Sequence, residues 1–249
     1  MTTALGDLAS RLARATRITV LTGAGVSAAS GIPTFRGENG LWRKVRAETL
    51  ATAEAFANDP KLVWEWYDWR RGMIAGAQPN AAHTVLAEWT RTRPGVSVIT
   101  QNVDGLHERA GTERLIRLHG SIWHVRCWTP CAAGRIDWQD LTVPLATLPP
   151  RCPHCGGLVR PGVVWFGESL DPAIVAAAQS ATECDAFLTI GTSAVVYPAA
   201  GLVHEARRRG AFTVEINPDA TPASDRVDMT IRLPAAEALS HLRTLAPAP

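Results

Sequence analysis

The 249-residue sequence contains no apolar run close to the roughly 20 residues that a membrane-spanning helix needs. Residues 1–17 have neither a continuous apolar core nor a small-residue cleavage site, so we expect no secretory signal. The formal net charge is only +2 and no extended basic patch is present, which argues against a nucleic-acid partner. We therefore expect a cytoplasmic protein with neither a membrane nor a nucleic-acid partner.

Cysteine is scarce, with five residues in the chain, and four of the five lie close together. A cluster of this kind is typical of a metal site in a reducing compartment rather than of disulfides. Its members form two closely spaced pairs, Cys127 with Cys131 and Cys152 with Cys155. Four thiolates complete the tetrahedral coordination of Zn²⁺ and leave no open position, so we expect a structural zinc ion. Cys184 stands apart, and we expect it to be a buried apolar side chain.

Apolar periodicity alternates between short strands and longer helices along most of the chain. We expect strands at 17–21, 96–99, 115–118, 186–190, 211–216 and 228–233. We expect helices at 5–16, 60–76, 80–89, 171–180, 199–209 and 235–245. This alternation predicts an α/β fold with a Rossmann-like, mostly parallel, doubly wound sheet. Segment 123–161 is rich in Cys, Pro and Trp without sustained periodicity, so we expect a small inserted zinc-binding module rather than more sheet.

Polar side chains follow two of the predicted strands. Gln101, Asn102 and Asp104 come just after strand 96–99, and His119 follows strand 115–118. In an open α/β sheet, ligands bind at the carboxyl ends of the strands. A histidine, with an ordinary pKa of about 6.5, can act as a base near neutral pH. Capping a strand is the commoner role for any one such residue, but the four together favour a site.

The strand at 17–21 leads into a glycine-rich segment, Gly23 to Ala28, that matches a dinucleotide-binding fingerprint with Ala in the last small position. Its backbone N–H groups would approach a pyrophosphate at a helix N-terminus. The acidic residue expected about 20 positions further on is not evident. A plain glycine turn therefore remains an alternative. The following loop, 31–46, is punctuated by glycines, and we expect it to be mobile.

Seven motifs, in this order, resemble those of the sirtuins, which are NAD-dependent protein-lysine deacylases: GAGVSAASGIPTFRG, TQNVDGLH, LHGS, the paired cysteines, RPGVVWFGE, GTSAVVYPA and EINPD. The resemblance implies one catalytic domain over 1–249. Its large Rossmann-like part would comprise about 1–30, 90–122 and 162–249. Its small part would comprise a helical segment at about 40–90 and the zinc module at about 123–161. NAD and an acylated-lysine protein or peptide would enter the cleft between these parts from opposite sides.

The resemblance also implies a role for each matching residue. His119 would be the general base, and Asn102 would belong to the catalytic centre. The residues that bind NAD would be Gly23, Ala24, Gly25, Ser27, Phe35, Arg36, Trp42, Gln101, Asn102, Val103, Asp104, Gly191, Thr192, Ser193, Asn217, Pro218, Asp219 and Ala235. The substrate would contact Ala51, Tyr67 and Arg70, and its backbone would pair as an added strand with Val163, Val164, Trp165, Phe166, Gly167 and Glu168. The expected products are nicotinamide, O-acyl-ADP-ribose and free lysine, with no part for zinc in the reaction.

Two residues of the helix predicted at 60–76 indicate which acyl group the site prefers. Tyr67 and Arg70 are three residues apart and so project from one helix face. In the sirtuin branch that removes malonyl, succinyl or glutaryl groups, such a pair binds the distal carboxylate, and a small residue at the position of Ala51 leaves room for it. The resemblance thus favours succinyl and malonyl groups, with acetyl removal as a second activity. The alternative is that Arg70 pairs with Glu65 or Asp68 on a solvated helix face.

Three other functions compete with deacylation. An NAD-dependent protein ADP-ribosyltransferase would use the same cleft, and a Rossmann oxidoreductase would use the same glycine-rich segment. A non-enzymatic zinc-binding module would rest on the four cysteines alone. The last alternative does not explain the polar residues at the strand ends.

Overall fold

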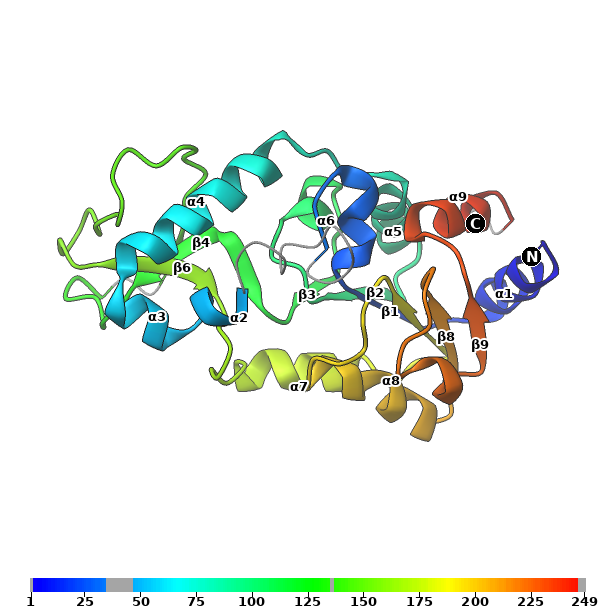
Figure 1. The fold of residues 1–249 in the computed structure, drawn as a ribbon. Helices are drawn as coiled ribbons and strands as arrows, with labels where there is room; N and C mark the ends of the chain where they lie inside the picture. The colour runs from blue at the N-terminus through cyan, green and yellow to red at the C-terminus, as the bar shows by residue number, and fades with distance from the viewer. Residues whose placement is uncertain (1, 35–46, 135–136, 246–249) are drawn as a thin grey trace.

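A six-stranded parallel sheet forms the larger part of the molecule, at the right in Figure 1. The structure is a computed structural model that describes residues 2–34, 47–134 and 137–245. In spatial order the strands are β3 (Leu115–Arg117), β2 (Val96–Thr100), β1 (Ile18–Thr22), β7 (Ala186–Ile190), β8 (Phe212–Ile216) and β9 (Met229–Ile231). The strand order therefore reverses between β1 and β7. At such a switch point the loops diverge and leave a crevice for a ligand.

The register of the sheet brings the ends of its central strands to one level. Thr22 at the end of β1 pairs with Thr100 of β2 and with Ile190 of β7. Ile190 pairs in turn with Ile216 of β8. The loops that follow these four strands therefore begin side by side at one edge of the sheet.

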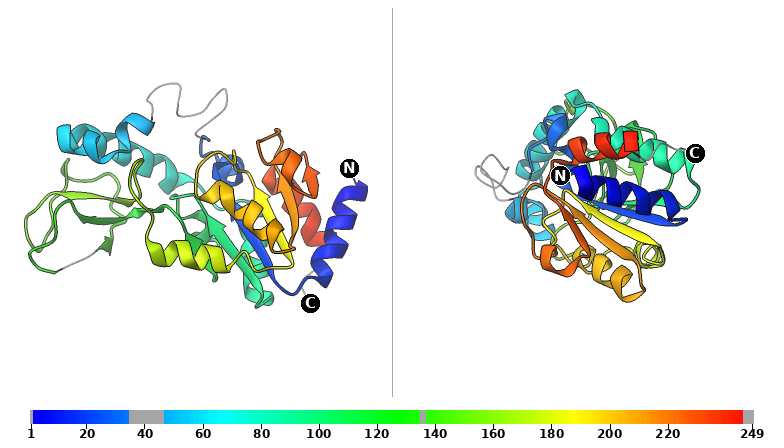
Figure 2. Two further views of the ribbon diagram at one scale, coloured as in Figure 1. Left: turned by 90° about the horizontal axis from the view of Figure 1, so that it is seen from below. Right: turned by 90° about the vertical axis from the view of Figure 1, so that its right-hand side faces the viewer.

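Helices cover both faces of this sheet, as the two views of Figure 2 show. One face packs against α1 (Thr2–Arg14), α5 (Ala81–Thr92) and α9 (Ala235–Leu245), and the other against α7 (Pro172–Ser180) and α8 (Ala199–Arg208). Because successive side chains of a strand point to opposite faces, Val20 packs in the first layer and Leu21 in the second. Burial on both faces gives these strands the apolar runs seen in the sequence. Among the described helices, none has the length and apolar character to cross a membrane.

The smaller part of the molecule, at the left in Figure 1, contains a second sheet. This sheet is antiparallel and has the order β5 (Trp138–Gln139), β4 (Gly120–Cys127) and β6 (Val159–Val163). It packs with α3 (Ala53–Asn58) and α4 (Pro60–Gly76), and α2 (Ala47–Leu50) precedes them in the chain. Segment 123–161 is thus a module separate from the large sheet, as predicted, but it carries strands of its own, with β4 and β6 at its two ends and β5 between them. A register shift in β4 and Pro161 in β6 disrupt the alternation by which a strand is recognised.

The longest helix of the smaller part, α4, begins where the sequence predicts. The carboxylate of Asp59 accepts a hydrogen bond from the N–H of Leu62 at 2.9 Å, and Pro60 occupies the first turn. Its inner face buries aromatic side chains, including Trp64 and Tyr67, in the core of the smaller part. The short helices α6 (Leu106–Arg109), η1 (Ala24–Ser30) and η3 (Ser224–Arg226) complete the fold.

Candidate active site

A cavity of about 1010 Å³ lies at the carboxyl ends of the central strands and reaches α4 of the smaller part. This volume is at the upper end of ordinary ligand pockets. The cavity brings together every predicted NAD- or substrate-contacting residue that the structure describes: Gly23, Ala24, Gly25, Ser27, Ala51, Tyr67, Arg70, Gln101, Asn102, Val103, Asp104, His119, Val163, Val164, Trp165, Phe166, Gly167, Glu168, Gly191, Thr192, Ser193, Asn217, Pro218, Asp219 and Ala235. Phe35, Arg36 and Trp42 lie outside the described residues.

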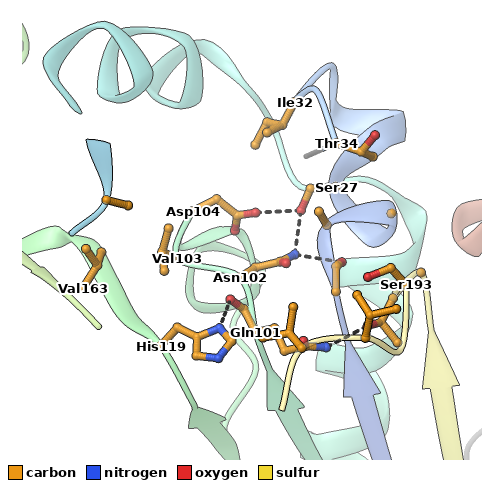
Figure 3. Close-up of a pocket in the computed structure, with 18 of the residues that line it drawn as sticks. Ser27, Ile32, Thr34, Gln101, Asn102, Val103, Asp104, His119, Val163 and Ser193 are labelled. Carbon is orange, nitrogen blue, oxygen red and sulfur yellow. Dashed lines mark hydrogen bonds between the residues drawn. The ribbon is translucent and has the colours of Figure 1, made fainter. Parts of the chain in front are cut away.

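His119 borders this cavity just after β3, and one hydrogen bond settles its tautomer. Its Nδ1 lies 3.0 Å from the backbone carbonyl oxygen of Gln101 (Figure 3). A carbonyl oxygen only accepts, so Nδ1 must carry the proton and Nε2 the lone pair. Burial lowers the pKa of His119, against a smaller opposing effect of the Gln101 carbonyl. The imidazole is therefore neutral near pH 7 and can accept a proton at Nε2.

Side-chain amides tie the loops at this edge of the sheet to one another. Gln101 donates to the Thr192 hydroxyl at 2.9 Å, which joins the loops after β2 and β7. Asn217, after β8, donates to the backbone oxygen of Thr192 at 2.9 Å. Asn102 donates to the backbone oxygen of Gly23 at 3.1 Å and to the Ser27 hydroxyl at 3.2 Å. These bonds hold four loops in one arrangement before any ligand binds.

Asp104 is buried at the floor of the cavity, and both its carboxylate and its backbone oxygen accept hydrogen bonds. Its carboxylate accepts from the Ser27 hydroxyl at 2.7 Å (Figure 3) and from the N–H of Leu106 at 2.9 Å. Its backbone oxygen accepts from the indole of Trp123 at 2.7 Å. The carboxylate thereby orients the Ser27 hydroxyl, which in turn lies within reach of Asn102.

Two buried histidines support this floor from behind. His83 lies 3.4 Å from the Ser27 hydroxyl, and His107 lies 3.0 Å from the Thr22 hydroxyl, with the two rings 4.9 Å apart. Burial lowers the pKa of His83 to about 4 and, with help from His83, that of His107 to about 3. Both are therefore neutral at pH 7. Neither histidine lines the cavity, and the sequence marks His83 only by its place in the first turn of α5.

The glycines after β1 allow the loops after β1 and β7 to approach each other closely. The N–H groups of Gly23 and Gly25 donate to the oxygens of Ile190 and Gly191, at 3.1 and 2.7 Å. A Cβ on Gly25 would lie 2.8 Å from the backbone of Gly191, which the fold cannot accommodate. The helix that follows, η1, is a 3₁₀-helix rather than an α-helix. The N–H groups of Gly23 and Gly25 are thus already bonded to protein, so a pyrophosphate contact at this segment would use other N–H groups.

Other N–H groups at the same place are available to an anion. Within residues 2–34, 47–134 and 137–245, no acceptor pairs with the backbone N–H of Ala24, Thr192 or Ser193. All three residues border the cavity. Convergent backbone N–H groups form a concave site for phosphate oxygens. The loops after β1 and β7 therefore fit the pyrophosphate of a dinucleotide.

Tyr67 and Arg70 enter the cavity from α4. They are only 1% and 6% exposed, and the Arg70 guanidinium lies 4.8 Å from the centroid of the Trp66 ring. Burial lowers the pKa of Arg70 and raises the pKa of Tyr67 to about 12, so the phenol keeps its proton. The two acidic residues considered as partners of Arg70, Glu65 and Asp68, bond to other groups. Glu65 pairs with Lys61 at 3.7 Å, and Asp68 accepts from the N–H of Leu145 at 2.9 Å. The alternative of an ion pair on a solvated helix face does not hold, because Arg70 is buried.

The segment after β6 joins the two parts along the cavity wall. Val163 still belongs to β6. The N–H of Val164 donates to the backbone oxygen of His119 at 3.0 Å, and the N–H of Phe166 donates to that of Ala51 at 2.9 Å. The segment thus fixes both the histidine and the small side chain at Ala51. Some of its backbone groups are already used, so fewer remain for the substrate strand than the sequence suggests.

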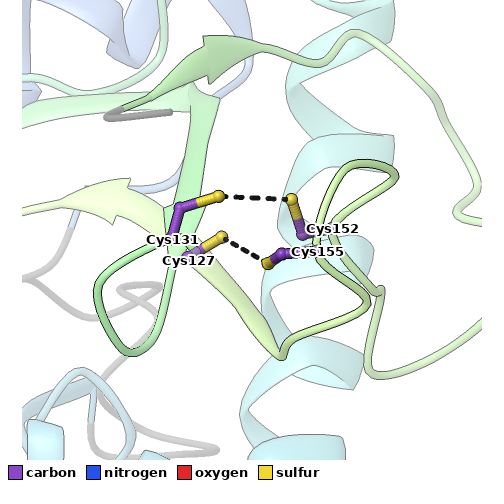
Figure 4. Close-up of side chains that lie close together, drawn as sticks. All are labelled: Cys127, Cys131, Cys152 and Cys155. Atoms are coloured by element: carbon purple, nitrogen blue, oxygen red, sulfur yellow. Dashed lines mark hydrogen bonds between the residues drawn. The ribbon is translucent and has the colours of Figure 1, made fainter. Parts of the chain in front are cut away.

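The four clustered cysteines form the predicted zinc site at one end of the second sheet (Figure 4). Their four Sγ atoms all lie within 4.8 Å of one another, with Cys127 and Cys155 3.7 Å apart and Cys131 and Cys152 4.0 Å apart. Tetrahedral Zn–S bonds of about 2.3 Å require S–S separations of about 3.8 Å. The donor set and spacing therefore fit a closed, structural zinc site. It lies outside the cavity, since no cysteine lines that space.

Comparison with known proteins places these features in a family context. The Sir2 family profile matches residues 23–198. The chain is 52% identical over 226 residues to an NAD-dependent protein deacylase of Aquifex aeolicus, which covers 90% of this chain and 93% of that protein. It is 48% identical over 236 residues to NAD-dependent protein deacylase 1 of Pseudomonas aeruginosa, with coverage of 93% and 94%.

Solved structures agree with the sequence matches. A Sir2 homologue in complex with NAD is 45% identical with a TM-score of 0.88, over 96% of this chain and 93% of that chain. A Sir2 protein solved with a deacetylated p53 peptide and 3′-O-acetyl ADP-ribose is 29% identical with a TM-score of 0.86, over 96% and 97%. The likeness therefore extends over both parts of the fold.

Proposed function

The chain belongs to the Sir2 family, and from this premise we propose that it is an NAD-dependent protein-lysine deacylase that prefers succinyl and malonyl groups. Acetyl removal is a second activity of the same site. The observation that carries the preference is a buried Tyr67–Arg70 pair that lines the same cavity as the neutral His119. The relatives are named deacylases and do not favour the ADP-ribosyltransferase alternative.

NAD fits the sheet side of the cavity. The N–H groups of Ala24, Thr192 and Ser193, which bond to no acceptor among the described residues, would hold its pyrophosphate. Gln101, Asn102, Val103 and Asp104 would line the nicotinamide and its ribose, and Asn217, Pro218, Asp219 and Ala235 the adenosine end. When bound, NAD supplies a ribose carbon that takes the acyl oxygen as nicotinamide leaves. The chain's own part is to hold that ribose against the acyl group.

His119 performs the proton transfer. Its Nε2 lone pair accepts a proton from a ribose hydroxyl, while the Nδ1–H bond to Gln101 holds the ring in the required tautomer. The lowered pKa keeps the base unprotonated at neutral pH. Attack of that hydroxyl on the acyl carbon breaks the bond to the lysine nitrogen, and one water is consumed, so that the products are free lysine, nicotinamide and O-acyl-ADP-ribose.

The end of the cavity next to α4 would recognise the acyl group. A carboxylate at the tip of a succinyl or malonyl chain would accept hydrogen bonds from Arg70 and from the Tyr67 hydroxyl. Charge-assisted bonds of this kind contribute about 1.5–3 kcal/mol each. Ala51, bonded through its backbone to Phe166, leaves room that a larger side chain would fill. An acetyl group fits the same space but gains none of these polar contacts.

The test is a side-by-side comparison of kcat/KM on one peptide that carries acetyl-, malonyl- or succinyl-lysine, with NAD present. We expect the two acidic acyl groups to be removed faster than acetyl, with O-acyl-ADP-ribose in the mass spectrum. Equal rates for all three groups, or a faster acetyl reaction, would refute the preference. A peptide that gains ADP-ribose instead of losing its acyl group would refute deacylation.

A further inference from the structure

A buried hydrogen bond joins the wall of the substrate cleft to the acyl-recognition helix. The indole Nε1 of Trp165, in the segment after β6, donates to the hydroxyl oxygen of Tyr67 on α4 at 3.0 Å. The two residues come from opposite sides of the acyl end of the cavity and both border it. Trp165 is 2% exposed, so water does not compete for this bond.

Trp165 is held rigidly in place. Its backbone N–H donates to the Glu168 carboxylate at 2.8 Å. The guanidinium of Arg160 lies 3.5 Å from the centroid of its ring and binds both oxygens of Glu168, at 2.5 and 2.9 Å. The ring of Phe56 packs against the indole of Trp165, with 5.3 Å between the ring centroids. Moving the indole away from Tyr67 would therefore disturb a largely buried ion pair, which is costly.

The direction of this bond limits what the Tyr67 hydroxyl can do. An indole N–H only donates, so Tyr67 must accept at this contact, and its single proton points elsewhere. In the part of the chain that the structure describes, no acceptor binds that proton. The phenol keeps the proton throughout the physiological range, since burial raises its pKa to about 12.

We propose that Trp165 is a positioning residue for acyl selectivity: its indole N–H occupies the acceptor side of the Tyr67 hydroxyl and so turns the phenolic proton toward an acyl carboxylate beside Arg70. This rests on the proposed function, because it takes Tyr67 and Arg70 as the carboxylate-binding pair. Without the indole donor the hydroxyl is free to rotate, and the ordered donor is lost before the substrate arrives.

Trp165→Phe tests the proposal because it keeps an aromatic ring over Arg160 and removes the N–H. We expect the ratio of desuccinylation to deacetylation, each measured as kcat/KM, to fall roughly tenfold, which corresponds to about 1.4 kcal/mol and to one net hydrogen bond. Trp64→Phe is the matched control. It removes a second buried indole N–H of the same core, which donates to the backbone oxygen of Val159 at 2.7 Å. We expect the control to leave the ratio unchanged.

A double-mutant cycle separates positioning from general damage. In a Tyr67→Phe background the hydroxyl is gone, so Trp165→Phe should lower the ratio no further. The proposal is overturned if Trp165→Phe lowers both activities equally, or lowers the ratio as much in the Tyr67→Phe background as in the wild type. If Tyr67→Phe reduces the ratio and Trp165→Phe does not, carboxylate recognition stands and only the positioning role fails. An unchanged ratio in Tyr67→Phe would overturn both.

Discussion

Arg70→Met keeps an unbranched side chain of similar length and removes the charge of a guanidinium that is only 6% exposed. In the wild type, burial has already removed most of the solvent around that charge, so a bound carboxylate displaces little water from it. Loss of the charge-assisted bonds is expected to cost about 1.5–3 kcal/mol. The kcat/KM for a succinyl-lysine peptide should therefore fall roughly 10- to 150-fold. The same change removes no contact specific to an acetyl group, so deacetylation should fall much less.

The assay compares succinyl- and acetyl-lysine on one peptide sequence, with NAD saturating and the melting temperature measured for each variant. Arg109→Met is a matched control, because Arg109 is an exposed arginine outside the cavity that bonds to Gln78 at 3.2 Å. We expect it to leave the ratio of the two activities unchanged. An equal loss of both activities in Arg70→Met, with the melting temperature unchanged, would refute carboxylate recognition by this residue.

Further predictions concern the base, the metal and the buried histidines. His119→Ala should lower turnover roughly 10²- to 10⁴-fold while circular dichroism reports an intact fold, and substantial residual deacylation would contradict the general-base role. Metal analysis should find one zinc per chain, which Cys155→Ser loses and Cys184→Ser retains, and chelation should lower the melting temperature. The free energy of unfolding should fall as pH drops from about 6.5 toward 4. His83 and His107 have folded pKa values of about 4 and 3, so the unfolded state binds more protons in that window. His107→Gln should make the free energy of unfolding, measured in denaturant titrations, depend less on pH. An unchanged pH dependence would contradict this role of His107.

The features that could be predicted from the sequence are those that depend on local patterns. The doubly wound sheet follows from apolar runs such as 186–190, and α4 follows from its cap at Asp59. The location of the site follows from one rule, because Gln101 and His119 come directly after strands of a parallel sheet. The zinc site follows from the cysteine spacing. The parallel register then brings distant segments together without further information.

What could not be predicted depends on contacts between remote segments. The Trp165–Tyr67 bond spans 98 residues and leaves no periodic trace in either segment. His83 reaches Ser27 only because α5 packs behind the loop after β1. The N–H groups of Gly23 and Gly25 bond to the loop after β7, which lies more than 160 residues away in the chain, and no sequence pattern marks that pairing. Sequence patterns identify the residue types a site needs, whereas pairing between segments decides which hydrogen-bonding atoms remain free to bind a ligand.

His119, the proposed base, connects the two parts of the fold. The side chain of His119 bonds to Gln101 in the large sheet, while its backbone oxygen accepts from Val164, which follows directly on β6 of the small sheet. β6 pairs along its length with β4, and Cys127 at the end of β4 pairs with Val159. The zinc cluster thus stabilises the strand pair that leads to the base, although it lies outside the cavity. The same segment also carries Trp165 and contacts Ala51. The proposed proton transfer and the proposed acyl recognition therefore depend on one stretch of backbone, and distortion of the small sheet should impair both.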